Sequence, residues 1–346
     1  MTFPLPLEQL RGATVLVTGG GGFLGQAIVR GLLARGAQAR SFSRQRHPGL
    51  DALGVEQLPG DLADAAAVGR AVQRCDVVFH VGAKAGVWGP YDDYHRANVM
   101  GTGHVIEACR RHGVKRLVYT SSPSVVFDGG DMEGVDESVP YPEWYEAAYP
   151  QTKAEAERAV RGANGAELAT VALRPHLIWG PGDNHLIPRI LARARAGQLR
   201  RIGRRACQVD SVFIDNAAEA HLLAAERLAL GSSIAGRVYF ISQGEPWPLW
   251  DLVAGILRAA GLPPVERSVP LPVARAAAGL SELVYRALRL RGEPRLTRFL
   301  VRELSTSHWF DISAARRDLG YAPKITIAEG LERLRQSFEQ TGQNHL

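Results

Sequence analysis

A short apolar segment that breaks at consecutive glycines constrains the fold of this chain more than any other feature. Residues 13–17 (ATVLV) are apolar and largely β-branched, as expected of a strand buried on both faces. After the glycines at 19–22, apolar residues recur at helical spacing until Gly36, a residue typical of helix ends. The sequence therefore predicts a strand, a tight turn and a helix in immediate succession.

The same alternation continues along the first half of the chain. Helices are predicted over 95–112 and 151–161, and strands follow the pattern of short apolar runs at 37–42, 76–81, 116–121, 169–173 and 238–241. Strands that alternate with helices of this length are joined by right-handed crossovers into a parallel sheet. The sequence predicts an α/β fold with a doubly wound, Rossmann-type parallel sheet.

Beyond residue 181 the alternation loosens, which indicates a second domain. Further helices are predicted over 187–197, 216–230 and 249–260, and Pro, Arg and Ala dominate after residue 263. We expect a dinucleotide-binding domain at 11–181 plus 205–243. We expect a smaller, mainly helical C-terminal substrate domain at 182–204 plus 244–346, packed over the carboxyl ends of the strands.

Composition and cysteine usage point to the cytoplasm. The 346 residues include three cysteines, Cys75, Cys109 and Cys207, which lie far apart without CxxC spacing. This pattern argues against a disulfide framework or a sulfur-ligated zinc site and fits a reducing compartment. No charged and then apolar leader precedes residue 13, and no apolar run reaches the roughly 20 residues that span a bilayer.

The net charge of +6 comes from an arginine-rich composition, with 41 Lys and Arg of which only four are lysine. Six arginines fall within 193–205, and seven fall within 271–302. Neither cluster has interleaved aromatic residues or a DNA-reading motif, so we expect no nucleic-acid partner. Each arginine cluster is expected either to be a solvated face or to attract an anionic ligand or an anionic membrane surface. Leu280, Leu283, Val284 and Leu288 recur at helical spacing within the second cluster. We expect this helix to cover the substrate pocket, or to make at most peripheral contact with an anionic membrane or a partner enzyme.

The glycine turn predicts a dinucleotide site. Gly19 permits the tight turn, Gly22 lets the backbone approach a diphosphate, and Gly25 allows close packing of helix and strand. Phe23 and Leu24 begin the helix, whose free N–H groups and dipole favour a negatively charged ligand.

The end of the second strand favours NADP(H) over NAD(H). NAD enzymes usually place an acid there to hold the ribose 2′-hydroxyl, whereas arginine accommodates a 2′-phosphate. Residues 39–47 contain no carboxylate, but Ser43 and Arg44 stand at the expected position. Arg44 stacked on the adenine, with NAD(H) as cofactor, is the alternative. Asp61 and Leu62 are placed to contact the adenine edge.

Tyr149 and Lys153 form the second functional motif. Four residues apart at a helix start, they share one face. A neighbouring ammonium would stabilise the Tyr149 phenolate, which lets this tyrosine exchange a proton with a ketone or alcohol oxygen. The preceding strand ends in Thr120, Ser121 and Ser122, whose hydroxyls can hold that oxygen.

Together these motifs resemble the extended short-chain dehydrogenase/reductases, and within them the 3β-hydroxysteroid dehydrogenase branch. Inside that branch the chain is most similar to the bacterial NADP-dependent reductases of 2-alkyl-3-ketoalkanoates in olefin biosynthesis. The resemblance covers nearly the whole chain and is carried by VFHVGAKAGVWGPY (77–91), RANVMGT (96–102), YTSSPSVVFDG (119–129), YPQTKAEAE (149–157), LRPHLIWGPGDNHLIPR (173–189) and FDISAARRDLGYAP (310–323).

The resemblance implies roles for individual residues. Ser122 would hold the substrate oxygen, with Ser121 and Ser124 as rivals. Tyr149 would be the acid–base, Lys153 its partner and ribose ligand, and Asn98 would link Lys153 to a proton-relay water. The other implied cofactor contacts are Gly82, Ala83, Lys84, Pro175 and His176. Residues 203–207 depart from the branch pattern, which puts transferred contacts there in doubt. A homodimer through the helices at 95–112 and 151–161 is also implied.

No metal is expected, because His176 and His185 have no Cys or acid partner at ligand spacing. Both are expected to line the pocket mouth. The hypothesis for function is an NADP-dependent oxidoreductase that reversibly reduces a hydrophobic β-keto acid to the 3-hydroxy acid. Alternatives are a 3β-hydroxysteroid dehydrogenase, a nucleotide-sugar epimerase with tightly bound NAD, and a non-catalytic NADP-binding redox sensor or scaffold.

Overall fold

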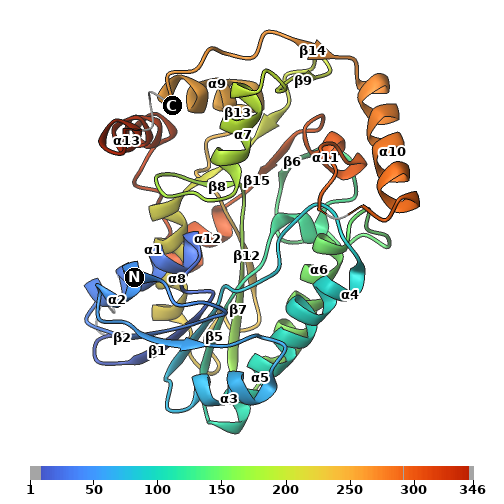
Figure 1. Cartoon of the computed structure of the whole chain (residues 1–346). Coiled ribbons are helices and arrows are strands. Elements are labelled where there is room, and N and C mark those ends of the chain that lie inside the picture. The colour runs from blue at the N-terminus through green and yellow to red at the C-terminus, as the bar shows by residue number, and fades with distance from the viewer. Residues whose placement is uncertain (1–8, 291, 343–346) are drawn as a thin grey trace.

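A seven-stranded parallel sheet organises the computed structural model, which describes residues 9–290 and 292–342 (Figure 1). The strand order is β12-β7-β5-β4-β1-β2-β3, which confirms the doubly wound fold. The strands are β1 (Thr14–Thr18), β2 (Gln38–Ser43), β3 (Glu56–Pro59), β4 (Val77–His80), β5 (Arg116–Thr120), β7 (Ala169–Pro175) and β12 (Val238–Ile241).

Alternation along the strands builds a hydrophobic core on each face of the sheet. Val15 and Val17 of β1 belong to one core, whereas Leu16 belongs to the other. Successive side chains of a strand point to opposite faces, so both faces of a central strand must be apolar. The first face is covered by α1 (Phe23–Ala34), α8 (Ile214–Arg227) and α12 (Ser313–Leu319), and the second by α3 (Ala65–Val72), α5 (Gly101–Arg111) and α6 (Ala148–Ala163).

The helix predicted over 95–112 differs from the expectation in its start and in its winding. It comprises α4 (Tyr91–Tyr94), a π-helical turn, η1 (His95–Met100), and then α5. A π turn rotates the following residues relative to a regular helix and is frequent near functional sites. Likewise α6 begins three residues before the predicted position, because a helix tolerates Pro150 within its first turn. Tyr149 therefore lies inside the helix.

Apart from α2, which lies beside β3, most of the remaining elements gather in the upper half of Figure 1, over the carboxyl edge of the main sheet. A second sheet has the order β13 (Trp247–Pro248), β10 (Gln208–Val209), β15 (His308–Phe310) and β6 (Met132–Val135). Two pairs join β8 (Ile178–Trp179) to β11 (Val212–Phe213) and β9 (Arg201–Ile202) to β14 (Ser268–Val269). The helices outside the main layers are α2 (Pro48–Asp51), α7 (Leu186–Arg195), α9 (Leu249–Ala259), α10 (Leu271–Ala287), α11 (Arg298–Glu303), α13 (Ile327–Gln340) and a 3₁₀ turn, η2 (Pro123–Val126).

The two expected domains pack against each other through a common hydrophobic core. The first hydrophobic core runs from β1 and α1 into α9 and α13, and α12 packs on α8 and β12 of the dinucleotide domain. The division at 11–181 plus 205–243 therefore stays a prediction. Within the described ranges, none of the helices combines the length and apolar character needed to cross a membrane.

Candidate active site

The residues singled out from the sequence converge on the carboxyl edge of the main sheet. The glycine loop follows β1 and holds Gly19, Gly22, Phe23, Leu24 and Gly25. At the end of β2 stand Ser43 and Arg44, and after β3 come Asp61 and Leu62. After β4 come Gly82, Ala83 and Lys84, after β5 comes Ser122, and at the end of β7 stand Pro175 and His176. Parallel strands bring these separate turns to one edge, where ligands of doubly wound folds bind.

The glycine loop has the shape that a dinucleotide requires. Gly19 adopts a positive φ of 68°, and a side chain there would lie 2.8 Å from the backbone of Gly82. A side chain on Gly25 would collide with the Gly19 carbonyl oxygen. The loop therefore folds tightly onto α1 and leaves the N–H groups of that helix facing the site. Such an N-terminus fits the diphosphate of a nicotinamide dinucleotide.

The end of β2 presents arginine rather than a carboxylate. The Ser43 hydroxyl donates to the Gln45 carbonyl at 2.8 Å, which shapes the turn. Arg44 is exposed, whereas Arg46 pairs with Asp51 at 2.8 Å. His47, which sequence reasoning missed, packs its ring against Gly21 of the glycine loop. Only its position in the fold identifies it, because 26 residues separate the two in sequence.

The turns after β3 and β4 place backbone more than side chains at the site. Asp61 accepts from its own turn, at 3.0 Å from the Ala63 nitrogen, and the Leu62 carbonyl lies 2.9 Å from His104 Nδ1. The Lys84 ammonium points away from the site and pairs with Asp93 at 3.0 Å. Lys84 therefore contributes to the site through its backbone N–H, which donates to Asn98.

Tyr149 projects from the first turn of α6 toward the end of β5. Ser122 and Ser124 line the same cavity and hydrogen-bond to each other at 2.9 Å, whereas Ser121 is buried outside that lining. Burial raises the pKa of Tyr149 to about 12, and the hydrogen bond from Ser122 opposes that rise only in part. We expected a stabilised phenolate. The structure shows instead a phenol that is protonated at neutral pH.

Lys153 explains this difference. Its Nζ donates to the Thr120 carbonyl at 2.6 Å and lies 4.2 Å from the centre of the Tyr119 ring. Burial lowers the pKa of Lys153 to about 7, although the Glu157 carboxylate opposes the shift. An ammonium that is only partly charged and bound to a carbonyl gives little support to a phenolate.

Asn98 is fixed at the π turn. Its side-chain oxygen accepts from the Lys84 N–H at 2.7 Å, and its amide nitrogen donates to the Lys84 carbonyl and to Thr152. Asn98 thus joins the turn after β4 to α6 and positions both of them. No direct contact joins Asn98 to Lys153 in the structure as described, so its relay role stays a prediction.

His80 anchors a buried polar network that the sequence reasoning overlooked. Its Nδ1 lies 2.8 Å from the Thr18 hydroxyl, and its Nε2 lies 2.9 Å from the Thr102 hydroxyl. Thr102 donates to the Asn98 carbonyl at 2.5 Å, which leaves it to accept from His80 Nε2. Burial lowers the pKa of His80 to about 3, so the ring is neutral and satisfied at both nitrogens. The network ties the glycine loop to the π turn.

A buried ion pair holds α6 against the sheet. Arg174 of β7 donates to both carboxylate oxygens of Glu157, at 2.6 and 3.0 Å, and both side chains are fully buried. The Tyr141 hydroxyl donates to the same carboxylate. Despite the cost of burial, Arg174 holds the pKa of Glu157 below its usual range. This pair fixes the helix that carries Tyr149 and Lys153.

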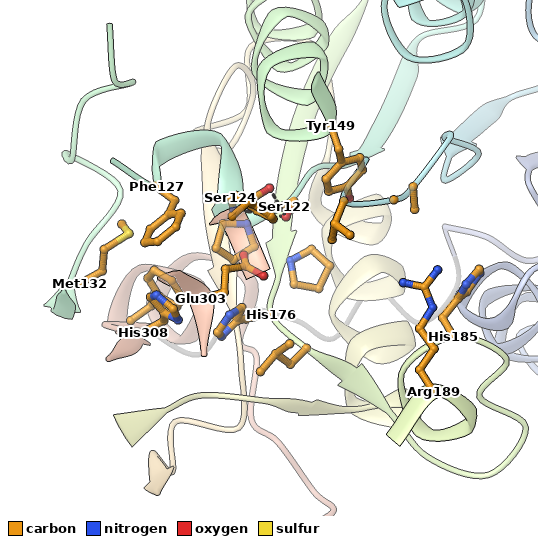
Figure 2. A pocket seen from close by; sticks show the side chains of 18 residues that line it. Ser122, Ser124, Phe127, Met132, Tyr149, His176, His185, Arg189, Glu303 and His308 are labelled. Carbon is orange, nitrogen blue, oxygen red and sulfur yellow. Dashed lines mark hydrogen bonds between the residues drawn. The ribbon is translucent and has the colours of Figure 1, made fainter. Parts of the chain in front are cut away.

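A cavity of about 290 Å³ opens beside Tyr149 (Figure 2). Its walls are mixed: Phe127, Met132, Phe299 and Phe310 form an apolar part, and polar side chains, Tyr149 and Ser122 among them, form the rest. Glu303, at the end of α11, faces the same space as Tyr149 and Ser122 in Figure 2. Burial alone raises the pKa of Glu303 to about 7.

Three histidines also line this cavity: His176, His185 and His308. Burial lowers the pKa of His176 to about 3 and that of His308 to about 4, so both rings are neutral. His176 and His185 line the cavity together, as expected of them. Among the described residues no cluster of His, Cys, Asp and Glu could hold a metal ion.

The arginine that lines the cavity does not come from residues 271–302, where the sequence has a cluster of arginines that could attract an anionic ligand. Arg189 of α7 lines the cavity and pairs with Glu293 at 3.0 Å. The segment 271–302 contributes Arg286 and Arg289 to a neighbouring cavity instead. Arg189 ends one of the segments that carry the resemblance, but no pattern gave it or Glu303 a role, because both reach the site only through long-range packing.

Comparisons with known proteins agree with this geometry. Residues 16–273 match the 3-beta hydroxysteroid dehydrogenase/isomerase family. The chain is 54% identical to a 2-alkyl-3-oxoalkanoate reductase of Stenotrophomonas maltophilia over 93% of this chain and 98% of that protein. It is 47% identical to a 2-alkyl-3-oxoalkanoate reductase of Shewanella oneidensis over 93% of this chain and 85% of that protein.

Among solved structures, MoeE5 in complex with UDP-glucuronic acid and NAD superposes with a TM-score of 0.73 and 25% identity, over 95% of this chain and 99% of that one. The family match, the reductase relatives and the Rossmann-type site agree with the resemblance found in the sequence. The chain thus belongs to the 3-beta hydroxysteroid dehydrogenase/isomerase family and is an NAD(P)-dependent oxidoreductase.

Proposed function

We propose that this protein is an NADPH-dependent ketoreductase that converts a 2-alkyl-3-ketoalkanoate to the 2-alkyl-3-hydroxyalkanoate. The observation that carries the proposal is a cavity with an apolar wall of phenylalanines and Met132, into which the Tyr149 phenol and the Ser122 hydroxyl both point. The names of the two reductase relatives support the choice of substrate class.

The site residues divide the work of a ketone reduction. When bound, the nicotinamide supplies a hydride to the keto carbon. Ser122 donates a hydrogen bond to the keto oxygen, and the Tyr149 phenol gives that oxygen its proton. Lys153 and the buried Arg174–Glu157 pair hold Tyr149 in place from the same helix. The glycine loop and the backbone after β4 would bind the dinucleotide.

The protonation state of Tyr149 favours reduction over oxidation. With its pKa raised to about 12 by burial, the phenol carries its proton throughout the neutral range. A protonated phenol can donate to a ketone at once, whereas removal of a proton from an alcohol requires a phenolate.

The cavity also fits an alkylated keto acid better than a polar sugar. Phe127, Met132, Phe299 and Phe310 offer apolar contacts to alkyl chains. Arg189 supplies positive charge for the carboxylate from the other end of the cavity in Figure 2. A sterol would use the apolar wall but would offer Arg189 no carboxylate beyond that of Glu293, its partner within the chain.

Oxidation of NADPH in the presence of a substrate panel tests the proposed function. The panel holds a 2-alkyl-3-keto acid, its methyl ester, a 3-ketosteroid and a UDP-sugar. We expect turnover with the keto acid and a higher KM for the ester, which lacks the carboxylate. Preferred turnover of the steroid, or epimerisation of the UDP-sugar, would contradict the proposal.

The cofactor preference gives a separate prediction. The double substitution Ser43→Asp and Arg44→Ala should weaken NADPH binding and strengthen NADH binding, because a carboxylate repels a 2′-phosphate and accepts from a free 2′-hydroxyl. Exposed Arg44 has no ion-pair partner among the described residues, so its loss leaves the turn intact. The measurement is kcat/KM for each cofactor, and an unchanged ratio would place 2′-phosphate recognition elsewhere.

Glu303 predicts the pH dependence of substrate binding. Below its pKa of about 7 the carboxyl is neutral and can donate to the substrate carboxylate; above it the ionised form repels that group. KM for the keto acid should therefore rise as pH increases through 7. Glu303→Gln stays neutral and retains a donor, so it should abolish this rise.

The methyl ester is the matched control for this prediction, because a neutral substrate should show a much smaller rise. Tyr149, His176 and His308 line the same cavity, but their pKa values of about 12, 3 and 4 keep them from titrating near pH 7. Lys153, whose pKa is also about 7, does not line this cavity and would affect the acid and the ester alike. An equal rise of KM in the wild-type protein and in Glu303→Gln would show that another group is responsible.

A further inference from the structure

The helix α10 presents an entirely apolar stripe to solvent. Its outward residues recur at helical spacing and all are exposed: Val273, Ala276, Ala277, Leu280, Leu283, Val284, Ala287 and Leu288. Leu280, Leu283 and Leu288 are 63%, 63% and 66% exposed. We call these eight residues the α10 stripe. A surface helix of a globular protein normally turns such a stripe inward.

The fold does not need the α10 stripe. The opposite side of α10 packs inward through Ala274, Ala278 and Glu282, which contact the small core around Ile202 and Val301. Glu282 accepts from the Arg298 backbone N–H at 2.8 Å and so fixes α10 to α11. The stripe is therefore an additional surface, and Figure 1 places α10 at the edge of the molecule.

The charges that border the stripe are positive. Arg275 and Arg286 follow one flank of the helix, and both are exposed. Arg298 lies beside the same flank, near Gly279. The acids of the region are already paired: buried Glu282 lies 4.0 Å from Arg286 and 3.6 Å from Arg298, and Glu293 pairs with Arg189. Because two arginines share the single Glu282 carboxylate, this flank keeps a net positive charge, and a second copy of the chain packed on the stripe would bring two such flanks together.

An opening toward the active site lies beneath α10. A cavity of about 550 Å³ is lined by Trp88, Tyr285 and Arg289, and it shares Val87 and Phe299 with the cavity at Tyr149. Trp144, which is 64% exposed, lines an adjoining cleft with Phe299. Tryptophan is enriched where proteins meet the lipid–water interface.

We propose that the α10 stripe docks on the surface of an anionic lipid bilayer. The leucines and valines enter the boundary between head groups and acyl chains, while Arg275, Arg286 and Arg298 contact anionic head groups. The cavity under α10 then opens at the membrane surface, where an alkyl-chain substrate can enter. Docking itself does not depend on the proposed substrate, so it can fail or succeed independently of the reductase activity.

Co-sedimentation of the full chain with vesicles tests this proposal. The vesicles contain phosphatidylcholine alone or phosphatidylcholine mixed with phosphatidylglycerol. We expect binding to the mixed vesicles at low salt, weak binding to the neutral ones, and loss of binding toward about 1 M salt, where the screening length falls to about 3 Å.

Two variants separate the apolar contribution to vesicle binding from the ionic contribution. The triple variant Leu280→Gln, Leu283→Gln, Leu288→Gln should lower the vesicle partition coefficient at least about tenfold, since each exposed leucine loses its apolar burial. Arg275→Gln should lower it about fivefold at low salt and hardly at high salt. The matched control is Leu53→Gln with Leu230→Gln, two leucines exposed to 42% and 41% far from α10 in sequence, and it should bind like the wild type.

Activity on a short-chain, water-soluble keto acid reports on folding, and the triple variant should keep it because its positions are exposed and line neither cavity.

The absence of binding at every salt concentration would overturn the proposal. Salt-resistant binding to neutral vesicles would also overturn it, since that means insertion without head-group recognition. A dimer in solution that the triple variant dissociates would assign the stripe to a second copy instead.

Discussion

Tyr149→Phe is expected to lower kcat by about 10²–10⁴-fold, the usual contribution of a positioned general acid. The phenol carries its proton at neutral pH, because burial raises its pKa to about 12, and it lines the cavity beside Ser122. Phenylalanine keeps the ring and its packing but removes the proton donor. NADPH affinity, measured by fluorescence titration, should remain near the wild-type value.

Tyr239→Phe is the matched control for this loss. It also removes a hydroxyl, which bonds Asp318 at 3.1 Å, but Tyr239 does not line the cavity. Its kcat should stay close to that of the wild type. If Tyr149→Phe retained near-full activity, another group would have to protonate the keto oxygen, and Glu303 on the cavity wall would be the first candidate.

Arg174→Leu is expected to lower the free energy of unfolding by about 3–5 kcal/mol, because it leaves the Glu157 carboxylate buried without its partner. Both side chains are fully buried, and the pair joins β7 to α6 through two hydrogen bonds. Urea denaturation followed by circular dichroism measures the change. Since α6 carries Tyr149 and Lys153, kcat should fall as well.

The double variant Arg174→Leu with Glu157→Leu separates the contribution of side-chain packing to stability from the cost of an unpaired buried charge. An apolar pair of similar volume often replaces a buried ion pair at little cost, so the double variant should recover much of the lost stability. An Arg174→Leu protein that unfolds at the wild-type urea concentration would show that Glu157 is solvated or protonated in the folded state.

Local sequence patterns predicted the sheet well, because its strands are buried on both faces. The run at 13–17 and the glycines after it could adopt few other structures, and β1 and α1 lie within a residue or two of the predicted ends. The π turn at 95–100 could not be foreseen. Its residues are common in ordinary α-helices, and the turn forms where Asn98 bonds the backbone of Lys84 and the hydroxyl of Thr152.

Motifs located the chemistry but not its electrostatics. The spacing of Tyr149 and Lys153 gave their shared face, whereas their pKa shifts depend on burial by residues from distant segments. His80 lies in a segment that carries the family resemblance, but its role, like that of Glu303, depends on partners far along the chain. The assigned cofactor contacts, the domain division and the homodimer through the helices at 95–112 and 151–161 stay predictions.

Transfer of deuterium from NADPH tests the central claim most directly. NADPH with both hydrogens at nicotinamide C4 replaced by deuterium, incubated with the protein and a 2-alkyl-3-ketoalkanoate, should give a 2-alkyl-3-hydroxyalkanoate that carries one deuterium on C3 by mass spectrometry. Tyr149→Phe should give the same product far more slowly. A product without deuterium on C3, or label found only in a steroid alcohol from a mixed-substrate reaction, would contradict the account.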